Sequence, residues 1–270
     1  LLIVKMKVKK LFDLSDKTIV LTGAAGHLGK NYVDGLSQVG ANVVLSDINY
    51  QGCKKIEKQM REKYDVDPLS VKLDLTDSKS IKCMVSKITK KYSSIDVLIN
   101  NAAYQGNDRI RKTPFEELPL DDWNEAISVN LTGIFLICQQ VGKIMKKQGA
   151  GNIINISSTY GLVAPDQRIY SNSGQNAGSF YSATKSAVIN LTRYLASYWA
   201  NTGIRVNTLS PGGVKRNQVK SFIKNYSKKT MLGRMAEQDE YVGAIIFLAS
   251  DASSYMTGSN LIIDGGWTAW

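Results

Sequence analysis

The feature that most limits the fold of this chain is a regular alternation along its length. Short apolar segments rich in β-branched residues alternate with longer stretches whose apolar residues recur at helical spacing. Such alternation predicts β-α-β units, which build a parallel sheet covered by helices on both faces. The seven expected strands are Thr18–Thr22, Asn42–Asp47, Ser70–Asp74, Asp96–Asn100, Asn152–Ser157, Arg205–Ser210 and Asn260–Asp264. The expected helices lie near 27–39, 50–64, 77–92, 121–148, 179–201 and 237–249.

The length of the chain limits how many domains it can form. Its 270 residues suit one large domain or two small ones, and no repeat, low-complexity tract or linker divides the sequence. We therefore expect a single domain over 13–270. Residues 1–12 are interpreted as an N-terminal extension, with disorder as one alternative. The apolar start Leu1–Val4 is too short for a membrane span or a signal-peptide core, so no membrane partner is expected.

The cysteines indicate the redox compartment. Cys53, Cys83 and Cys138 are widely separated and odd in number. This argues against a disulfide framework and against a zinc site. We therefore expect a cytoplasmic protein with free thiols and no metal.

The net charge of +11 raises the question of a nucleic-acid partner. However, the lysines are scattered through helical stretches, as at 54–63, 79–91 and 143–147, and are not gathered with aromatic residues in one tract. Solvated helix faces explain them better, so no nucleic-acid partner is expected. The positive field would also attract an anionic substrate.

A glycine-rich turn follows the first expected strand. Gly23, Gly26 and Gly29 fit a tight turn, a close backbone approach to a pyrophosphate and close helix packing. The helix that follows offers backbone amides and the positive end of its dipole. With the alternating pattern, this turn predicts an α/β fold: a single doubly wound, Rossmann-like domain with a seven-stranded parallel sheet.

Acidic residues at later strand ends refine the cofactor prediction. Asp47 ends the second strand near the spacing at which a carboxylate accepts hydrogen bonds from the adenosine ribose and repels a 2′-phosphate, which favours NAD over NADP. Asp74 is placed to reach the adenine, although capping of the helix that starts near Asp77 is a close alternative. Asn101 and Ala102 follow the fourth strand, where the chain passes beside the cofactor.

Tyr181 and Lys185 are four residues apart in an expected helix, which places both side chains on one face. A phenol with a pKa near ~10 is a poor base at neutral pH. A neighbouring ammonium favours the phenolate and lowers that pKa. The pair therefore predicts an acid/base group that works at physiological pH.

Together these residues resemble the short-chain dehydrogenase/reductase family in its compact, single-domain form. The resemblance covers nearly the whole chain from about Leu14 to Gly266. The motifs that carry it are the glycine turn, Asp74, Asn100-Asn-Ala-Ala103, Val129-Asn-Leu-Thr-Gly133, Asn155-Ile-Ser-Ser158, Tyr181-Ser-Ala-Thr-Lys185, Ser210-Pro-Gly-Gly213 and Ile263-Asp-Gly-Gly266.

The resemblance implies four catalytic roles. Tyr181 exchanges a proton with the substrate oxygen, and Lys185 lowers its pKa and binds the nicotinamide ribose. Ser158 positions and polarises the substrate oxygen. Asn130 holds a water in a proton relay behind the lysine. Cofactor contacts are expected from Gly23, Gly26, His27, Leu28, Gly29, Asp47, Asp74, Leu75, Asn101, Ala102, Tyr181, Lys185, Pro211, Gly212 and Val214, and substrate contacts from Ser158, Tyr160, Tyr181 and Gly213.

The chain also departs from the family pattern. His27 stands where most compact members have glycine, so its side chain must point away from the phosphates or contact the adenosine side. Lys215 and Arg216 stand where a threonine usually lies near the nicotinamide amide. Arg216 is expected at the surface, with an anionic substrate as the alternative. An insertion of roughly 164–180 is rich in donors and acceptors, which fits a polyhydroxylated substrate as well as it fits a solvated loop.

We therefore predict a hydride-transferring oxidoreductase of a secondary alcohol/ketone pair, with NAD favoured over NADP. The leading substrate class is a sugar or sugar phosphate, because the segment Tyr160–Pro165 and the tail Trp267–Trp270 resemble oxidoreductases of bacterial surface-sugar pathways, such as flagellin glycosylation. The resemblance implies a dimer or tetramer formed through the helices over 121–148 and 179–201. The alternatives are a non-catalytic NAD sensor and an enzyme acting on apolar alcohols or 3-oxoacyl substrates.

Overall fold

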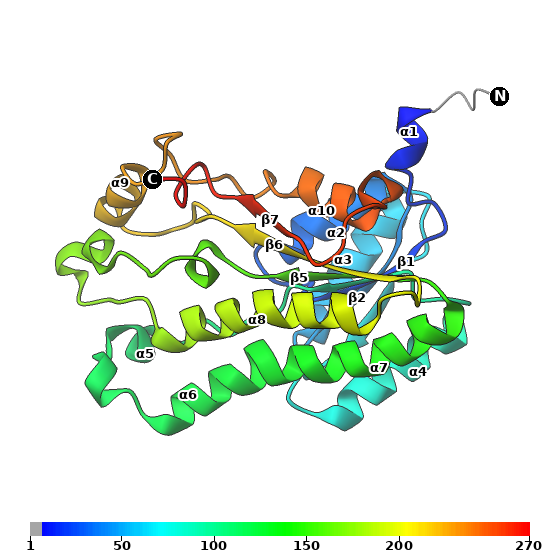
Figure 1. Ribbon diagram of the computed structural model, residues 1–270, viewed down its shortest axis with the longest axis horizontal. Coiled ribbons are helices and arrows are strands. Elements are labelled where there is room, and N and C mark those ends of the chain that lie inside the picture. Colours follow the sequence, from blue (N-terminus) through cyan, green and yellow to red (C-terminus); the bar gives the residue numbers. More distant parts are fainter. Residues whose placement is uncertain (1–6) are drawn as a thin grey trace.

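A seven-stranded parallel sheet forms the centre of the computed structural model, which describes residues 7–270. The strand order is β3-β2-β1-β4-β5-β6-β7, so the direction of winding reverses between β1 and β4 (Figure 1). In open sheets of this kind, ligands bind at the carboxyl ends of the strands near that reversal. The strands are β1 Thr18–Thr22, β2 Asn42–Asp47, β3 Leu69–Lys72, β4 Val97–Asn100, β5 Gly151–Ile156, β6 Ile204–Pro211 and β7 Asn260–Ile263.

Helices cover both faces of the sheet, as the sequence predicts. One face is covered by α2 (Gly29–Gln38), α3 (Tyr50–Lys63) and α10 (Val242–Ala249). The other is covered by α4 (Ser78–Lys91), α7 (Gly133–Gln148) and α8 (Ser179–Tyr198). The remaining helices are α1 Val8–Leu11, α5 Asp108–Lys112, α6 Leu120–Ile127 and α9 Lys220–Ser227, with a π-helical turn at Ser128–Thr132 and 3₁₀ turns at Phe115–Glu117, Thr159–Gly161, Gln167–Ser173 and Asp251–Ser253.

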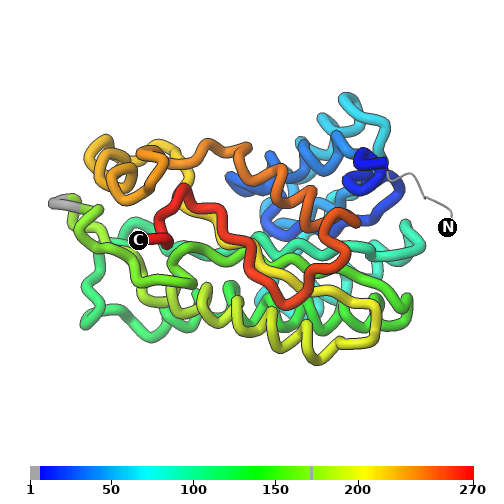
Figure 2. The backbone as a smooth tube through the Cα atoms, turned by 45° about the horizontal axis from the view of Figure 1, so that its top comes forward, coloured from blue at the N-terminus to red at the C-terminus, as the bar shows by residue number. Residues whose placement is uncertain are grey.

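The chain ends lie on different sides of the molecule. Both views place the C-terminus beside the segment that carries α9, whereas α1 lies at the opposite end (Figure 1, Figure 2). Residues 8–11 of the expected N-terminal extension form a helical turn, and residues 1–6 lie outside the described residues.

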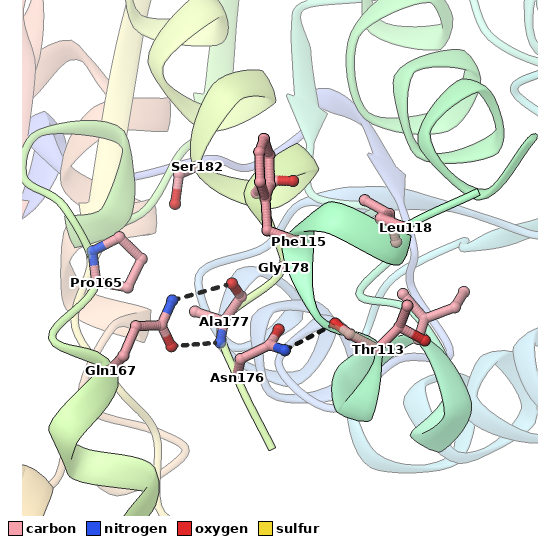
Figure 3. A pocket seen from close by; sticks show the side chains of 11 residues that line it. Thr113, Phe115, Leu118, Pro165, Gln167, Asn176, Ala177, Gly178 and Ser182 are labelled. Atoms are coloured by element: carbon pink, nitrogen blue, oxygen red, sulfur yellow. Dashed lines mark hydrogen bonds between the residues drawn. The ribbon is translucent and has the colours of Figure 1, made fainter. Parts of the chain in front are cut away.

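Two long loops, 104–120 and 159–178, are joined to each other. The backbone N–H of Asn176 donates to the carbonyl of Arg111 at 2.8 Å, and its side-chain amide donates to the carbonyl of Thr113 at 2.9 Å (Figure 3). Within the insertion, the Gln167 amide bonds both the N–H and the carbonyl of Ala177 (Figure 3). These hydrogen bonds tie the insertion to the loop 104–120, while Gln167, Arg168 and Ser173 remain exposed, so the choice between a substrate contact and a solvated loop stays open.

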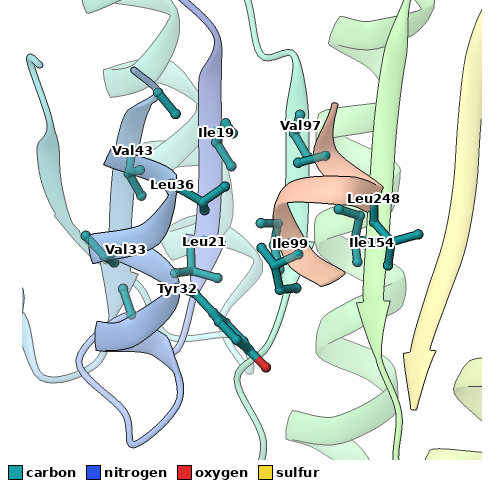
Figure 4. Close-up of a cluster of buried hydrophobic side chains, with 14 of the residues drawn as sticks. Ile19, Leu21, Tyr32, Val33, Leu36, Val43, Val97, Ile99, Ile154 and Leu248 are labelled. Carbon is teal, nitrogen blue, oxygen red and sulfur yellow. The ribbon is translucent and has the colours of Figure 1, made fainter. Parts of the chain in front are cut away.

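The core explains why the strands are apolar throughout. Ile19 and Leu21 of β1 pack under α2 with Leu36, while Val20 between them points to the opposite core cluster (Figure 4). A parallel strand that is buried on both faces needs apolar residues on both. Its sequence is therefore a continuous apolar segment and not an alternation of apolar and polar residues.

The helices differ from the expected ones in four places. The stretch predicted as one helix over 121–148 contains the π-helical turn at Ser128–Thr132. Helix α10 begins at Val242 and not near 237, because residues 237–241 form turns. The short helices α5 and α9 lie in segments where no helix is predicted.

The helical stretch Leu120–Gln148 is long and apolar enough for a membrane span by length and composition alone. Its residues Ile134, Ile137, Val141 and Met145 are buried in the core cluster under the sheet. That is the packing of a core helix in an α/β domain.

Candidate active site

A cleft of about 530 Å³ opens at the carboxyl ends of the central strands, at the reversal between β1 and β4. It brings together residues from widely separated segments of the chain. The predicted residues that line it are Gly23, Gly26, His27, Leu28, Asp47, Asp74, Leu75, Asn101, Ala102, Tyr181 and Lys185. The cleft also includes Ser46, Ile48, Tyr104, Gln105, Glu125, Ser157 and Arg216.

The glycine turn forms one wall of this cleft. Gly23 has a φ of +66°, and its carbonyl accepts a hydrogen bond from Gly26 N at 3.0 Å. A Cβ on Gly29 would lie 2.1 Å from the same carbonyl oxygen, which is possible only for glycine. Helix α2 then begins without a side-chain cap, which leaves amide donors at its N-terminus for a ligand.

His27 faces the cleft with an unsatisfied nitrogen. Its Nε2 is buried and has no hydrogen-bond partner among the described residues. Burial, followed by the charges of Arg216 and Lys30, lowers the pKa of the His27 imidazole. A buried orphan donor or acceptor is uncommon, so this nitrogen and the uncapped helix fit a dinucleotide cofactor.

Asp47 is held rigidly at the end of β2. Its two carboxylate oxygens accept from Ala25 N at 3.0 Å and from Asn49 N at 2.9 Å. A carboxylate has about four acceptor sites, so it can still accept from ribose hydroxyls. Lys185 bonds the carbonyl of Ile156 at the end of β5, three strand spacings or roughly 14 Å away, so it cannot neutralise Asp47.

Asp74 and Asn101 hold the neighbouring loops. Asp74 accepts from the N–H of Thr76 at 2.9 Å and from its hydroxyl at 2.7 Å. Helix α4 is capped by Asp77, which accepts from Lys79 N, so the alternative that Asp74 caps this helix is wrong. Asn101 Nδ2 donates to the carbonyls of Thr22 and Gly23 at 3.0 and 3.2 Å, which ties the glycine turn to β4.

Helix α8 carries the tyrosine–lysine pair into the cleft. The Nζ of Lys185 lies 5.6 Å from the ring centroid of Tyr181. It also donates to the carbonyl of Ile156 at 2.7 Å, and the residue is 2% exposed. Burial lowers the pKa of Lys185 to about 8.

The electrostatics of Tyr181 differ from the expectation. Burial raises the pKa of the Tyr181 phenol, and the groups that lower it are the hydrogen-bonded Ser158 side chain and the charge of Arg216. The expected lowering of the Tyr181 pKa by Lys185 stays a prediction; the lysine is itself buried, and burial favours its neutral form.

Asn130 lies in the π-helical turn and is completely buried. Its Oδ1 accepts from Tyr104 N at 2.6 Å, and its Nδ2 donates to the Tyr104 carbonyl at 2.9 Å. This amide thus positions the Tyr104 backbone at the edge of the cleft. The expected role in a water relay stays a prediction.

Several predicted contacts lie behind the cleft wall. Tyr160 packs its ring 6.3 Å from Trp267, and its hydroxyl shares a hydrogen bond with Tyr170. Gly213 N donates to the Tyr226 hydroxyl at 2.6 Å. Gly212 and Gly213 line a separate cavity of about 100 Å³, while Pro211 and Val214 are buried. None of these residues lines the cleft, and their expected ligand contacts stay predictions.

A second cavity of about 520 Å³ lies between the insertion and the loop 104–120. It is lined by Phe115, Leu118, Pro165, Gln167 and Ser182, among others (Figure 3). The buried ring of Phe180 packs against Ile110 and Tyr104. Phe180 belongs to α8, as does Ser182, which lines this cavity. This cavity shares no lining residue with the cleft.

Sequence reasoning missed several residues that line the cleft, among them Ser46, Tyr104, Gln105, Glu125 and Ser157. Tyr104 follows the Asn100–Ala103 motif directly, and that position was the available signal. Arg216 was expected at the surface; its side chain is exposed, yet it lines the cleft. Among residues 7–270, no group of three potential ligands could hold a metal ion.

Comparisons with known proteins agree with this geometry. Residues 23–268 match the family described as enoyl-(acyl carrier protein) reductase. The chain is 34% identical over 254 residues to post-translational flagellin modification protein A of Campylobacter coli, covering 94% of this chain and 99% of that one. It is 32% identical over 269 residues to D-threitol dehydrogenase of Mycolicibacterium smegmatis, covering 95% of each.

A solved structure supports the same assignment. Gluconate 5-dehydrogenase from Burkholderia cenocepacia J2315, in complex with NADP and tartrate, has a TM-score of 0.87 at 30% identity, covering 98% of this chain and 100% of that one. The fold and the site thus define an oxidoreductase that acts on an alcohol or its ketone. The chain belongs to the short-chain dehydrogenase/reductase family, as its motifs predict.

Proposed function

We propose that the protein is an NAD-preferring dehydrogenase or reductase of a polyhydroxylated secondary alcohol or ketone, such as a sugar or sugar derivative. The observation that carries this proposal is that Tyr181 and Lys185 line the same cleft as the glycine turn and Asp47, with Ser158 near enough to the phenol to lower its pKa.

The residues divide the reaction between them. A bound nicotinamide supplies the hydride acceptor or donor, which is chemistry that no side chain offers. In the oxidation, the Tyr181 oxygen accepts the hydroxyl proton while the carbon–oxygen bond becomes a carbonyl. Ser158 lies near enough to the phenol to lower its pKa, and its hydroxyl holds the substrate oxygen beside Tyr181. Lys185 orients the phenol and, while protonated, favours its anionic form.

The NAD preference rests on Asp47. Its charge would repel the 2′-phosphate of NADP, and its oxygens can accept from the 2′- and 3′-hydroxyls of NAD. Lys185 and Arg216 are the two lysine or arginine residues of the described cleft lining, and they stand on segments that follow β5 and β6. Neither is placed beside β2, where a 2′-phosphate would need a partner.

Replacing Asp47 with asparagine should reduce this preference. The new amide would keep one acceptor for the turn but would lose the negative charge. The ratio of kcat/KM for NAD to kcat/KM for NADP should therefore fall by about tenfold or more. A tenfold change corresponds to ~1.4 kcal/mol, the size of one modest charge interaction. Steady-state kinetics with both cofactors measures the ratio. Asp65→Asn is the matched control, because this carboxylate is exposed and has no ion-pair partner among the described residues. An unchanged ratio in Asp47→Asn would reject the role.

The polyhydroxylated substrate class is supported by the side of the cleft next to Tyr181. The phenols of Tyr160 and Tyr170 lie close enough to Tyr181 to affect one another's pKa. They are backed by rings of Phe222, Tyr226 and Trp267. These rings lie behind the cleft wall, but the hydroxyls of Tyr160 and Tyr170 near the phenol suit a sugar-like molecule, whose faces are apolar and whose rim carries hydroxyls. The similarity to proteins named for D-threitol and gluconate fits the same class.

The test is NAD reduction by the full chain with a panel of polyols, sugars, sugar acids and apolar alcohols, and the reverse reaction with 3-oxoacyl substrates. We expect turnover with at least one polyhydroxylated compound. Turnover of only apolar alcohols or 3-oxoacyl compounds would replace the substrate class. NAD binding without turnover of any compound would favour the alternative of a sensor.

We further propose that the protein is a homo-oligomer formed through α7 and α8. Their outer faces expose Phe135, Tyr194 and Tyr198, and the two tyrosine rings stack at 5.9 Å. Exposed aromatic residues on adjacent helices are typical of an interface between protein chains. The cytoplasmic location and the absence of a nucleic-acid partner stay predictions.

A further inference from the structure

We propose that Arg111 and Arg216 form a binding subsite for a carboxylate or phosphate group of the substrate, at the mouth of the catalytic cleft. This inference rests on the proposed function and narrows it: the polyhydroxylated substrate is an anion, such as a sugar acid or a sugar phosphate, whose charged group lies a few atoms from the reacting hydroxyl.

The first observation is that these two arginines lack a counter-ion. Arg61, Arg109, Arg168 and Arg234 each form an ion pair with an Asp or Glu, and Arg205 donates to two backbone carbonyls. Arg111, Arg193 and Arg216 have no carboxylate partner in the described part of the chain, and of these three Arg216 lines the catalytic cleft. A free guanidinium beside a reaction centre is a fork of donors suited to a carboxylate or phosphate.

The second observation is that the backbone fixes Arg216 at the cleft. Its N–H donates to Gln218 Oε1 at 2.5 Å, and Gln218 Nε2 donates to the carbonyl of Val214 at 2.9 Å. Val214 is buried and pairs with Ala236 in an isolated bridge. The segment is therefore held in place although the Arg216 side chain itself is exposed.

Arg111 is held from the other loop. Its carbonyl accepts from Asn176 N at 2.8 Å, and Asn176 also binds Thr113, so the insertion supports α5 (Figure 3). The side chain has a single long contact, from Nε to the carbonyl of Gln105 at 3.5 Å. Most of its donors are left for a ligand.

Both arginines reach the cleft: Arg216 lines it, and Arg111 Nε lies 3.5 Å from the carbonyl of Gln105, which lines it too. Solvent reaches the Arg216 side chain, but its partial burial in the cleft lowers the pKa of the guanidinium; the Tyr181 phenol opposes this shift, and the charge of Arg111 adds to it. Like charges held close together without a counter-ion are unfavourable, whereas an oxyanion between them would remove the repulsion and gain charge-assisted hydrogen bonds.

The subsite adjoins the reacting group. Arg216 shares the cleft lining with Tyr181 and Lys185, and its charge is felt by the Tyr181 phenol. Arg111 affects Tyr170, on the insertion side of the phenol. His27 of the glycine turn lines the same cleft as Arg216, so the competing anion is the pyrophosphate of the cofactor. The experiment has to separate these two sources.

The test compares matched neutral and anionic substrates, D-sorbitol with D-gluconate and glycerol with glycerate, in the wild type, Arg216→Gln and Arg111→Gln. We expect Arg216→Gln to lower the anionic-to-neutral ratio of kcat/KM by about 10- to 100-fold, with a smaller loss for Arg111→Gln. Arg193→Gln is the matched control. Arg193 is exposed and forms no ion pair in the described part of the chain, but it lies three turns along α8, about 18 Å from Tyr181. The Arg193→Gln variant should have the same anionic-to-neutral ratio of kcat/KM as the wild type.

A binding measurement makes the result independent of turnover. Calorimetric titration of NAD-loaded protein with D-gluconate and with inorganic phosphate should give a Kd that Arg216→Gln raises at least tenfold, with the Kd for NAD itself unchanged within about twofold. Loss of NAD affinity in step with the anion would assign Arg216 to the pyrophosphate and overturn the inference. The inference would also be overturned if Arg216→Gln left the Kd for the anion unchanged, or if the wild type bound no anion at all. Arg216-dependent binding without turnover of any panel compound would leave the subsite standing while the proposed function fails.

Discussion

Replacing Tyr181 with Phe should lower kcat for polyol oxidation by about 10³-fold, within the usual range for loss of a general acid/base. Phenylalanine keeps the ring that packs beside Phe180 and the Lys185 ammonium, so the fold and the NAD affinity should remain. Steady-state kinetics gives kcat, and titration calorimetry gives the Kd for NAD.

The control for this substitution is Tyr255→Phe, since Tyr255 is fully exposed and far along the chain from the cleft. It should behave as the wild type. If Tyr181→Phe retained a tenth or more of the wild-type kcat, another group would have to carry the proton. A parallel loss of NAD affinity would mean that the variant reports binding and not proton transfer.

Replacing Gly29 with Ala should damage both stability and cofactor binding. The added Cβ would lie 2.1 Å from the Gly23 carbonyl and 2.9 Å from atoms of Ala24, all of them backbone. The turn must therefore shift. We expect a loss of about 3 kcal/mol in the free energy of unfolding, at the upper end for overpacking, and a Kd for NAD raised at least tenfold.

Gly243→Ala is the matched control, because a Cβ there meets no atom within 4 Å and the residue lies inside α10. It should stabilise the protein by up to about 1 kcal/mol through helix propensity. Urea unfolding of both variants measures the difference. Equal stabilities for Gly29→Ala and the wild type would show that the tight approach at the glycine turn is not required.

The sheet and the glycine turn could be predicted because local chemistry determines them. β1 and β2 have the predicted bounds, since each is a β-branched apolar run that must be buried on both faces. The close approach of Gly29 to Gly23 likewise follows from a short motif. In these segments the burial or the close approach depends on a few neighbouring residues, so it can be predicted from one sequence.

Features that depend on residues far apart in the chain were not predictable in the same way. The pKa of Tyr181 is set by burial and by Ser158 and Arg216, which reach it from the segments after β5 and β6. Asn130 meets Tyr104 because a π-helical turn and the loop after β4 come together. The insertion is polar in sequence, yet Ile169 anchors it against Tyr226 and Trp267.

The central claim, that Tyr181 carries the proton and that nearby cations tune it, is tested most directly by the pH dependence of kcat/KM for oxidation of a neutral polyol. The groups that face the phenol are Ser158, Lys185, Arg216, Tyr160 and Tyr170. Because the phenolate is the reactive form, kcat/KM should rise with pH on the alkaline side and then level off. Because the positive charge of Arg216 lowers the pKa of Tyr181, Arg216→Gln should move that rise to higher pH. A flat profile in the wild type, or a shift of the rise to lower pH in Arg216→Gln, would contradict the account.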